Sequence, residues 1–144
     1  GVAGYPEKHF ESPNMRVDLR HLKAKVDAGA EYIVTQMFYD NNHYFKFVEE
    51  CRKMGIEVPI IPGIKVLTSE KQMVSLSKFF HIELPIDLVQ KIEACKSPEE
   101  VRKVGIEWTI QQSKELMEYG VPCIHYFTMG KSTALCEVAN EIFQ

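Results

Sequence analysis

Polar side chains occur at four places where an apolar stretch of this sequence ends, and they are the residues best placed to do chemistry: 5–11, 35–40, 61–65 and 125–131. If the apolar stretches are parallel strands, their carboxyl ends meet at one edge of a sheet, which is where α/β proteins bind ligands. Gln36 stands out, because an amide within an apolar strand is costly unless it is hydrogen-bonded. Its partner is either neighbouring backbone or a flat heterocycle that carries donors and acceptors along one edge.

A second group of polar residues follows the first apolar stretch. His9 and Glu11 share a loop, and Asp18 and His21 have the i, i+3 spacing of one helical face. This spacing matches no metal-ligand motif, so we predict no metal site and interpret these side chains as ligand contacts or surface residues. Lys25 belongs to the same predicted helix and lies next to the face that carries Asp18 and His21. Its ammonium group either pairs with a phosphate or is solvated.

The segment Gly130-Lys131-Ser132-Thr133 is similar to the end of a phosphate-binding P-loop, because it follows a predicted strand and opens a predicted helix. A full P-loop also needs glycine five residues before Gly130, where this chain has His125. Only 11 residues follow Thr133, too few for a later strand with a magnesium-binding acid. The helix could still hold an anion at its amino terminus. One hypothesis is therefore a non-catalytic phosphate- or nucleotide-binding module that uses Gly130, Lys131 and Ser132.

Apolar patterns and helix signals predict the elements that position these residues. Apolar runs predict strands at 1–5, 32–38, 58–64 and 123–128. Helical periodicity predicts helices at 17–29, 41–55, 69–80, 85–94, 97–119 and 131–143. Ser69 with Gln72 resembles a capping box, and Ser97, Pro98 and Glu100 form the clearest helix start in the chain.

The alternation of strands and helices predicts an α/β fold with a parallel sheet. The strands are continuous apolar runs, as expected when both faces of a sheet are covered. A small doubly wound sheet and half of a (β/α)₈ barrel fit the length equally well, because a complete barrel needs about 250 residues.

Composition narrows the class of protein. The chain has 144 residues, a mass of 16.6 kDa, 45% hydrophobic and 26% charged residues, and a net charge of -3. These values are typical of one globular domain and exclude a disordered chain. The absence of a basic excess argues against nucleic-acid binding, and the short apolar runs provide no membrane-spanning helix.

The four cysteines contain no C-x-x-C pair, which favours reduced, buried thiols and a cytoplasmic setting. The chain begins Gly1-Val2-Ala3, without methionine, and these residues belong to a predicted strand. We therefore expect residues 1–144 to be a single segment of a longer domain.

Five segments follow one another in an order and spacing specific to one family: 1–9 (GVAGYPEKH), 18–30 (DLRHLKAKVDAGA), 35–40 (TQMFYD), 59–64 (PIIPGI) and 125–128 (HYFT). Together they resemble methylenetetrahydrofolate reductase, the flavin enzyme of one-carbon metabolism. The resemblance implies a (β/α)₈ TIM barrel of which this chain is the carboxyl-terminal half, strands five to eight. The general-acid glutamate of the family then belongs to the missing amino-terminal half, so no catalytic residue is expected here.

The resemblance also implies roles for single residues. FAD-contacting positions of the family match Tyr5, His9, Asp18, His21 and Lys25, and we expect Asp18 and Lys25 to face the flavin at the strand carboxyl ends. Positions that bind the folate pterin or line the pocket shared by folate and nicotinamide match Gln36, Gln72, Leu76 and Met129. Gly130 and Lys131 stand where the family often has Asn-Arg.

The implied reaction reduces 5,10-methylenetetrahydrofolate to 5-methyltetrahydrofolate, with electrons passing from NADH or NADPH through FAD. Such an oxidoreductase serves folate metabolism and methionine biosynthesis. We expect a cytoplasmic homo-oligomer that binds neither nucleic acid nor membrane. The isolated 144-residue chain is expected to be inactive, because it lacks the general acid.

Overall fold

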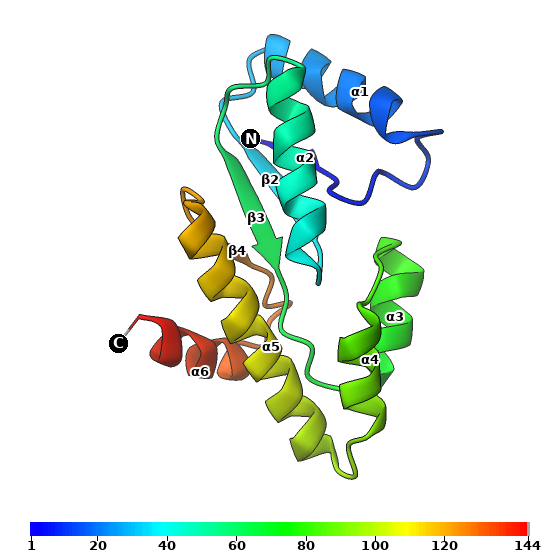
Figure 1. Cartoon of the computed structure of the whole chain (residues 1–144), viewed down its shortest axis with the longest axis vertical. Helices are drawn as coiled ribbons and strands as arrows, with labels where there is room; N and C mark the ends of the chain where they lie inside the picture. Colours follow the sequence, from blue (N-terminus) through cyan, green and yellow to red (C-terminus); the bar gives the residue numbers. More distant parts are fainter. Residues whose placement is uncertain (144) are drawn as a thin grey trace.

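The computed structural model describes residues 1–143 and alternates strands with helices along most of the chain (Figure 1). Within these residues, β1 (Val2–Gly4), β2 (Ile33–Met37), β3 (Ile60–Ile64) and β4 (His125–Tyr126) form one parallel sheet in sequential order. The helices are α1 (Met15–Asp27), α2 (Asn41–Lys53), α3 (Glu70–Phe80), α4 (Ile86–Glu93), α5 (Pro98–Tyr119) and α6 (Thr133–Ile142). The predicted α/β class and parallel sheet are confirmed.

Two predicted helix starts are confirmed, and the capping box predicted at a third start is wrong. The Ser97 hydroxyl accepts the Glu100 N–H at 3.2 Å at the start of α5, and Asp40 caps α2 by accepting the Asn42 N–H at 2.9 Å. Ser69 precedes α3 but its side chain makes no capping hydrogen bond. Gln72 does not complete a capping box, because its Oε1 accepts the Thr68 N–H at 2.7 Å instead.

The last predicted strand, 123–128, is mostly irregular. β4 contains only His125 and Tyr126, which pair with Gly63 and Ile64 at the edge of the sheet. A four-residue turn follows, closed by a hydrogen bond from the Lys131 N–H to the Thr128 carbonyl, so α6 begins at Thr133 rather than 131. An edge strand is hydrogen-bonded to a neighbour on one side only, so fewer interactions keep it extended than in a central strand.

Three helices pack against one face of the sheet. Leu22 of α1, Phe47 of α2 and Leu116 of α5 share a buried cluster with Ile33 and Ile60 of the sheet. Residues of the opposite face, such as Ala3 and Val34, are not fully buried. Figure 1 shows α2 and α5 lying along the strands on the same side of the sheet. The sheet therefore has one covered face and one open face.

Side chains of α5 fix the segment that leaves β2 at its carboxyl end. The Trp108 indole N–H donates to the Tyr39 carbonyl at 3.0 Å, and the Gln112 amide donates to the Phe38 carbonyl at 2.9 Å. Buried backbone carbonyls need such partners. The strand end that carries Gln36 is thereby held by a long helix.

Gly105 brings α5 against the segment after β3. A Cβ atom at this position would lie 1.7 Å from the Leu67 carbonyl oxygen. In an open helix, alanine would be more stable than glycine by about 1 kcal/mol. Here the overlap is with backbone, so we expect Gly105→Ala to lower the free energy of unfolding of the full-length protein by roughly 1–3 kcal/mol.

Urea denaturation tests this expectation, with the exposed Lys114→Ala on the same helix as control. The control should stay within about 0.5 kcal/mol of the natural protein. A gain in stability for Gly105→Ala would show that α5 does not approach residue 67 this closely.

The cysteines are free, but they are not all buried. Cys51 lies in the core, Cys95 is partly exposed, and Cys123 and Cys136 are exposed. Of the four thiols expected to be buried, only that of Cys51 is, because Cys95 follows the end of α4, Cys123 precedes the short edge strand and Cys136 lies on an outer face of α6. No helix within residues 1–143 is long and apolar enough to cross a membrane.

Candidate functional site

The open face of the sheet carries a cavity of about 540 Å³, which we call the sheet cavity. Its lining combines small residues of the strands with larger side chains at the strand carboxyl ends. These residues are Gly1, Val2, Ala3, Tyr5, Tyr32, Val34, Thr35, Gln36, Met37, Phe80, Phe127 and Met129. Three residues singled out from the sequence, Tyr5, Gln36 and Met129, therefore meet in one cavity.

Gln36 sits where the pairing of β2 with β3 shifts register, between Val34 and Met37. The Thr35 hydroxyl accepts the Gly63 N–H at 2.9 Å within this irregularity. The Gln36 Oε1 accepts the next backbone N–H, that of Met37, at 2.9 Å. Its amide nitrogen donates to no other described residue. The neighbouring backbone thus satisfies the oxygen of this amide, while its two N–H donors remain at the sheet cavity without a partner among the described residues.

Asp18 organises the loop between β1 and α1. One carboxylate oxygen accepts the His9 N–H at 3.0 Å and the other accepts the Ser12 hydroxyl at 2.9 Å. The Glu11 N–H donates to the His9 Nδ1 at 3.3 Å, which makes that nitrogen an acceptor. The Glu11 carboxylate 3.9 Å away is then no ion-pair partner in this state. Tyr5 meets the His9 ring edge-on, with ring centroids 4.5 Å apart.

The other predicted flavin contacts on α1 lie apart from this loop. His21 and Lys25 are exposed, and Lys25 is in the last turn of the helix, two turns beyond Asp18. A helix that returns between parallel strands has its last turn near their amino ends. Asp18 thus lies in the first turn of α1 and Lys25 in its last turn, and the expectation that both face the flavin stays a prediction.

A second cavity, of about 410 Å³, lies between the segments that follow β3 and β4, and we call it the loop cavity. Gln72 and Met129 line it, and Met129 also lines the sheet cavity. Leu76, the remaining predicted pocket residue, is only 4% exposed and packs in a core cluster with Met37 and Leu67. It lines neither cavity.

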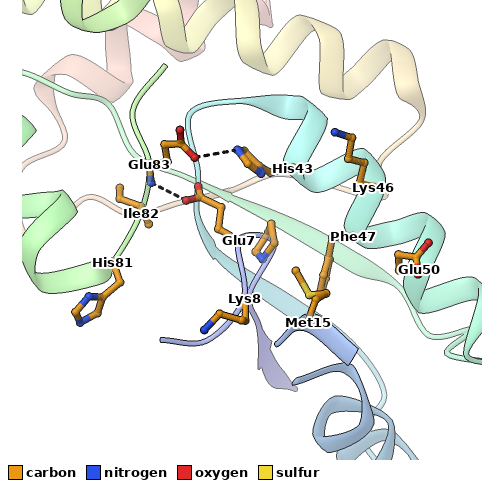
Figure 2. Close-up of a pocket in the computed structure, with 11 residues that line it drawn as sticks. Glu7, Lys8, Met15, His43, Lys46, Phe47, Glu50, His81, Ile82 and Glu83 are labelled. Atoms are coloured by element: carbon orange, nitrogen blue, oxygen red, sulfur yellow. Dashed lines mark hydrogen bonds and ion pairs between the residues drawn. The ribbon is translucent and has the colours of Figure 1, made fainter. Parts of the chain in front are cut away.

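Sequence reasoning missed Glu7, which joins three segments next to a cavity of about 700 Å³. Its carboxylate accepts the Glu83 N–H at 2.6 Å, and His43 lies 4.0 Å from the Glu83 carboxylate. Figure 2 shows these side chains pointing toward one another from the β1–α1 loop, α2 and the segment after α3. The second Glu7 oxygen is buried without a partner among the described residues, and burial raises the pKa of this carboxyl.

The pKa of the Glu7 carboxyl is higher in the folded protein than in the unfolded chain. Folding is therefore most favourable when this carboxyl is protonated. That contribution is present at acid pH and is lost as the pH rises through the raised pKa. Glutamine keeps the acceptor for Glu83 without the buried charge. We therefore expect Glu7→Gln to raise the urea midpoint of the full-length protein, with a gain that grows from about pH 4 to neutral pH.

A matched control is Glu11→Gln, which alters an exposed carboxylate of the same loop. It should leave the pH dependence close to that of the natural protein. A Glu7→Gln effect that is equal at acid and neutral pH would contradict the role assigned to burial.

Among residues 1–143 no three histidine, cysteine, aspartate or glutamate side chains lie close enough together to hold a metal ion. The polar groups that line the sheet cavity are the Gln36 amide and the hydroxyls of Tyr5, Tyr32 and Thr35, beside apolar walls. Such a set binds and orients an organic ligand through a few directed hydrogen bonds.

Comparison with known proteins connects this chain to one family. The family model described as methylenetetrahydrofolate reductase matches residues 1–142. A Caenorhabditis elegans protein named probable methylenetetrahydrofolate reductase (NADPH) is 35% identical over 144 residues, with 99% of this chain and 22% of that protein covered. The Arabidopsis thaliana methylenetetrahydrofolate reductase (NADH) 1 is 37% identical over 139 residues, covering 90% of this chain and 24% of that protein.

The Escherichia coli 5,10-methylenetetrahydrofolate reductase is 36% identical over 139 residues, which cover 94% of this chain and 47% of that protein. This chain thus spans less than half the length of these relatives. A solved structure of an uncharacterized Clostridium thermocellum protein, described as binding two copies of 5-methyl-5,6,7,8-tetrahydrofolic acid, superposes with a TM-score of 0.69. It is 21% identical, and the match covers 97% of this chain and 52% of that one, which establishes a shared fold.

Proposed function

Because this chain belongs to the methylenetetrahydrofolate reductase family, we propose that it is the carboxyl-terminal half of the catalytic barrel of a flavin-dependent reductase. The reaction is the reduction of 5,10-methylenetetrahydrofolate to 5-methyltetrahydrofolate with NADH or NADPH as donor. The observation that carries the proposal is the family match over residues 1–142, together with Gln36 at a cavity on the open face of the sheet.

The topology supports a half-barrel. A doubly wound sheet reverses its strand order at a switch point and has helices on both faces. This sheet keeps the order β1-β2-β3-β4, and α1, α2 and α5 share one buried cluster on one face. Continuing the sequence of strands from either edge would close a barrel around the sheet cavity. Residues 1–144 are then one segment of a domain whose first half precedes them.

The sheet cavity suits a flat, largely apolar ring system such as that of FAD. Its floor is made of small side chains, among them Gly1, Ala3 and Val34, and Phe127 and Met129 add apolar walls. Tyr5 lies at its rim against His9. When bound, FAD supplies hydride transfer between the nicotinamide donor and the folate.

The residues of this chain bind and orient the folate and the cofactor. The Gln36 amide nitrogen offers two donors to a pterin edge, while its oxygen is steadied by the Met37 N–H. Asp18 acts as a positioning residue, because both its oxygens hold the loop that carries His9. Gln72 lines the loop cavity, and its side-chain oxygen is held by the Thr68 N–H. Phe127 and Met129 exclude water from the ring.

His21 and Lys25 are further proposed FAD contacts, and both side chains are accessible on α1. Their distance from the strand carboxyl ends suits a part of the cofactor remote from the ring. Leu76 supports the pocket from within the core. We also expect a cytoplasmic homo-oligomer.

Purification of the full-length protein tests the proposal. We expect flavin absorption bands, release of FAD on denaturation, and oxidation of NADH or NADPH that depends on methylenetetrahydrofolate. Assays with each nucleotide identify the donor. A protein that takes up no flavin on reconstitution and oxidises neither nucleotide would refute the proposal. The alternative module built on Gly130, Lys131 and Ser132 is not favoured, because these residues lie within the family match.

A further inference from the structure

The loop cavity is positively charged and contains no carboxylate in its lining. Its polar lining comprises Lys65, Arg102 and Lys131, the hydroxyls of Thr68, Thr128 and Thr133, and the Gln72 amide. Arg102 is the only one of the three cations with a counter-charge among the described residues, a two-point contact with Glu137 of α6. The cavity therefore has cations available to an anionic ligand.

Lys65 is the unusual member of this set. It follows β3 directly, is only 7% exposed, and makes no hydrogen bond or ion pair with any described residue. Burial lowers the pKa of its ammonium group, because the charged form loses water without gaining a partner. Buried charges in proteins are normally paired. A side chain of this kind at a cavity wall indicates that its partner is a ligand.

The first turn of α6 supplies donors to the same cavity. Thr133, Ala134 and Leu135 line it, and they are the first three residues of a ten-residue helix. The side chain of Ser132, at the N-cap, makes no capping hydrogen bond. The opening N–H groups of a helix have no acceptor within the helix, and its dipole favours negative charge there.

We propose that the loop cavity is an oxyanion subsite in which Lys65 provides the buried positive charge and the first turn of α6 provides N–H donors. Its ligand is a carboxylate or phosphate group on a molecule whose other end lies in the sheet cavity. Met129 and Phe127 line both cavities, so one extended ligand can reach from one to the other. The identity of that molecule rests on the proposed function, whereas the subsite itself is tested directly by the binding of a simple anion.

Inorganic phosphate is the first probe. Binding is followed in the full-length protein by calorimetric titration at constant ionic strength, for the natural protein, Lys65→Met and Lys131→Met. We expect about tenfold weaker phosphate binding for Lys65→Met, the loss typical of one charge-assisted hydrogen bond. Lys131→Met should weaken binding less, because Lys131 is exposed and solvated.

Lys114→Met is the matched control, since it removes an exposed lysine of α5 that lies outside the cavity lining. Unchanged phosphate affinity in Lys65→Met would overturn the proposal, whatever the activity of the protein. If Lys65→Met does not fold, Lys65→Gln replaces it, and unchanged phosphate affinity in that variant would overturn the proposal.

A second measurement distinguishes the two sources of the oxyanion. If the group is a substrate carboxylate, Lys65→Met should raise the KM for glutamate-bearing methylenetetrahydrofolate and leave the KM for the corresponding tetrahydropteroate, which lacks the glutamate, unchanged. If the group is a nucleotide phosphate, Lys65→Met should raise the KM for the nicotinamide nucleotide instead, and phosphate should compete with that nucleotide. No change in either KM would contradict an oxyanion subsite that belongs to a ligand of this enzyme.

Discussion

Replacement of Gln36 by alanine in the full-length protein is expected to reduce kcat/KM for the folate about ten- to a hundredfold, with a much smaller effect on oxidation of the nicotinamide donor. The loss of a buried hydrogen bond costs about 1–3 kcal/mol, and 1.4 kcal/mol corresponds to about tenfold. A pterin edge offers paired donors and acceptors to the amide. A nicotinamide stacked on the flavin would need the amide less. Steady-state kinetics of the two half-reactions test the difference.

Two further variants make this prediction specific. Gln36→Glu keeps an oxygen for the Met37 N–H but removes the two donors at the sheet cavity. It should therefore impair folate use about as strongly as Gln36→Ala does. Gln90→Ala removes an exposed glutamine of α4 and should leave both half-reactions unchanged. Equal losses of the two half-reactions in Gln36→Ala would contradict the assignment of Gln36 to the pterin.

The sequence was sufficient to predict which segments become strands and helices, because local signals and the global fold agree over most of this chain. Ser97, Pro98 and Glu100 start α5, and Gly120 ends it in the left-handed conformation, with φ 90°. Ser69 shows where local signals fail. Its capping box required Gln72 to turn back to the Ser69 backbone, but the amide instead bonds Thr68, whose N–H precedes the helix.

The site was predictable only in part. Gln36 could be found because a polar residue in an apolar strand is a local anomaly. Lys65 directly follows a strand too, but lysine at a strand end is ordinarily solvated, and nothing in the sequence shows that residues 102, 131 and 133–135 line the same cavity. Glu7 likewise acquires its role from Glu83, 76 positions away. Such contacts depend on tertiary packing rather than on spacing in the sequence.

The isolated chain, residues 1–144, is expected to associate or aggregate and to leave methylenetetrahydrofolate unreduced. The strands predicted at 1–5 and 123–128 would leave two long unpaired edges, but β4 is only two residues long, so the edge at β4 is shorter than expected. The open face of the sheet is the stronger cause. Without the other half of the barrel, the lining of the sheet cavity faces water, including Tyr32 and Met129, which are 42% and 57% exposed. Exposed apolar surface of this kind favours association.

Loss of activity is expected to be complete, because the resemblance to the family places the general acid in the missing half. FAD should bind weakly at best, since the isolated chain provides one wall of the sheet cavity and leaves the opposite side open. Sedimentation velocity over a range of concentrations and FAD titration of the isolated chain test both expectations. Co-expression with the preceding half of the domain should restore flavin binding, which separates a missing wall from a misfolded chain. A stable monomer that binds FAD tightly would contradict the half-barrel, because a closed flavin site would then exist within these residues alone.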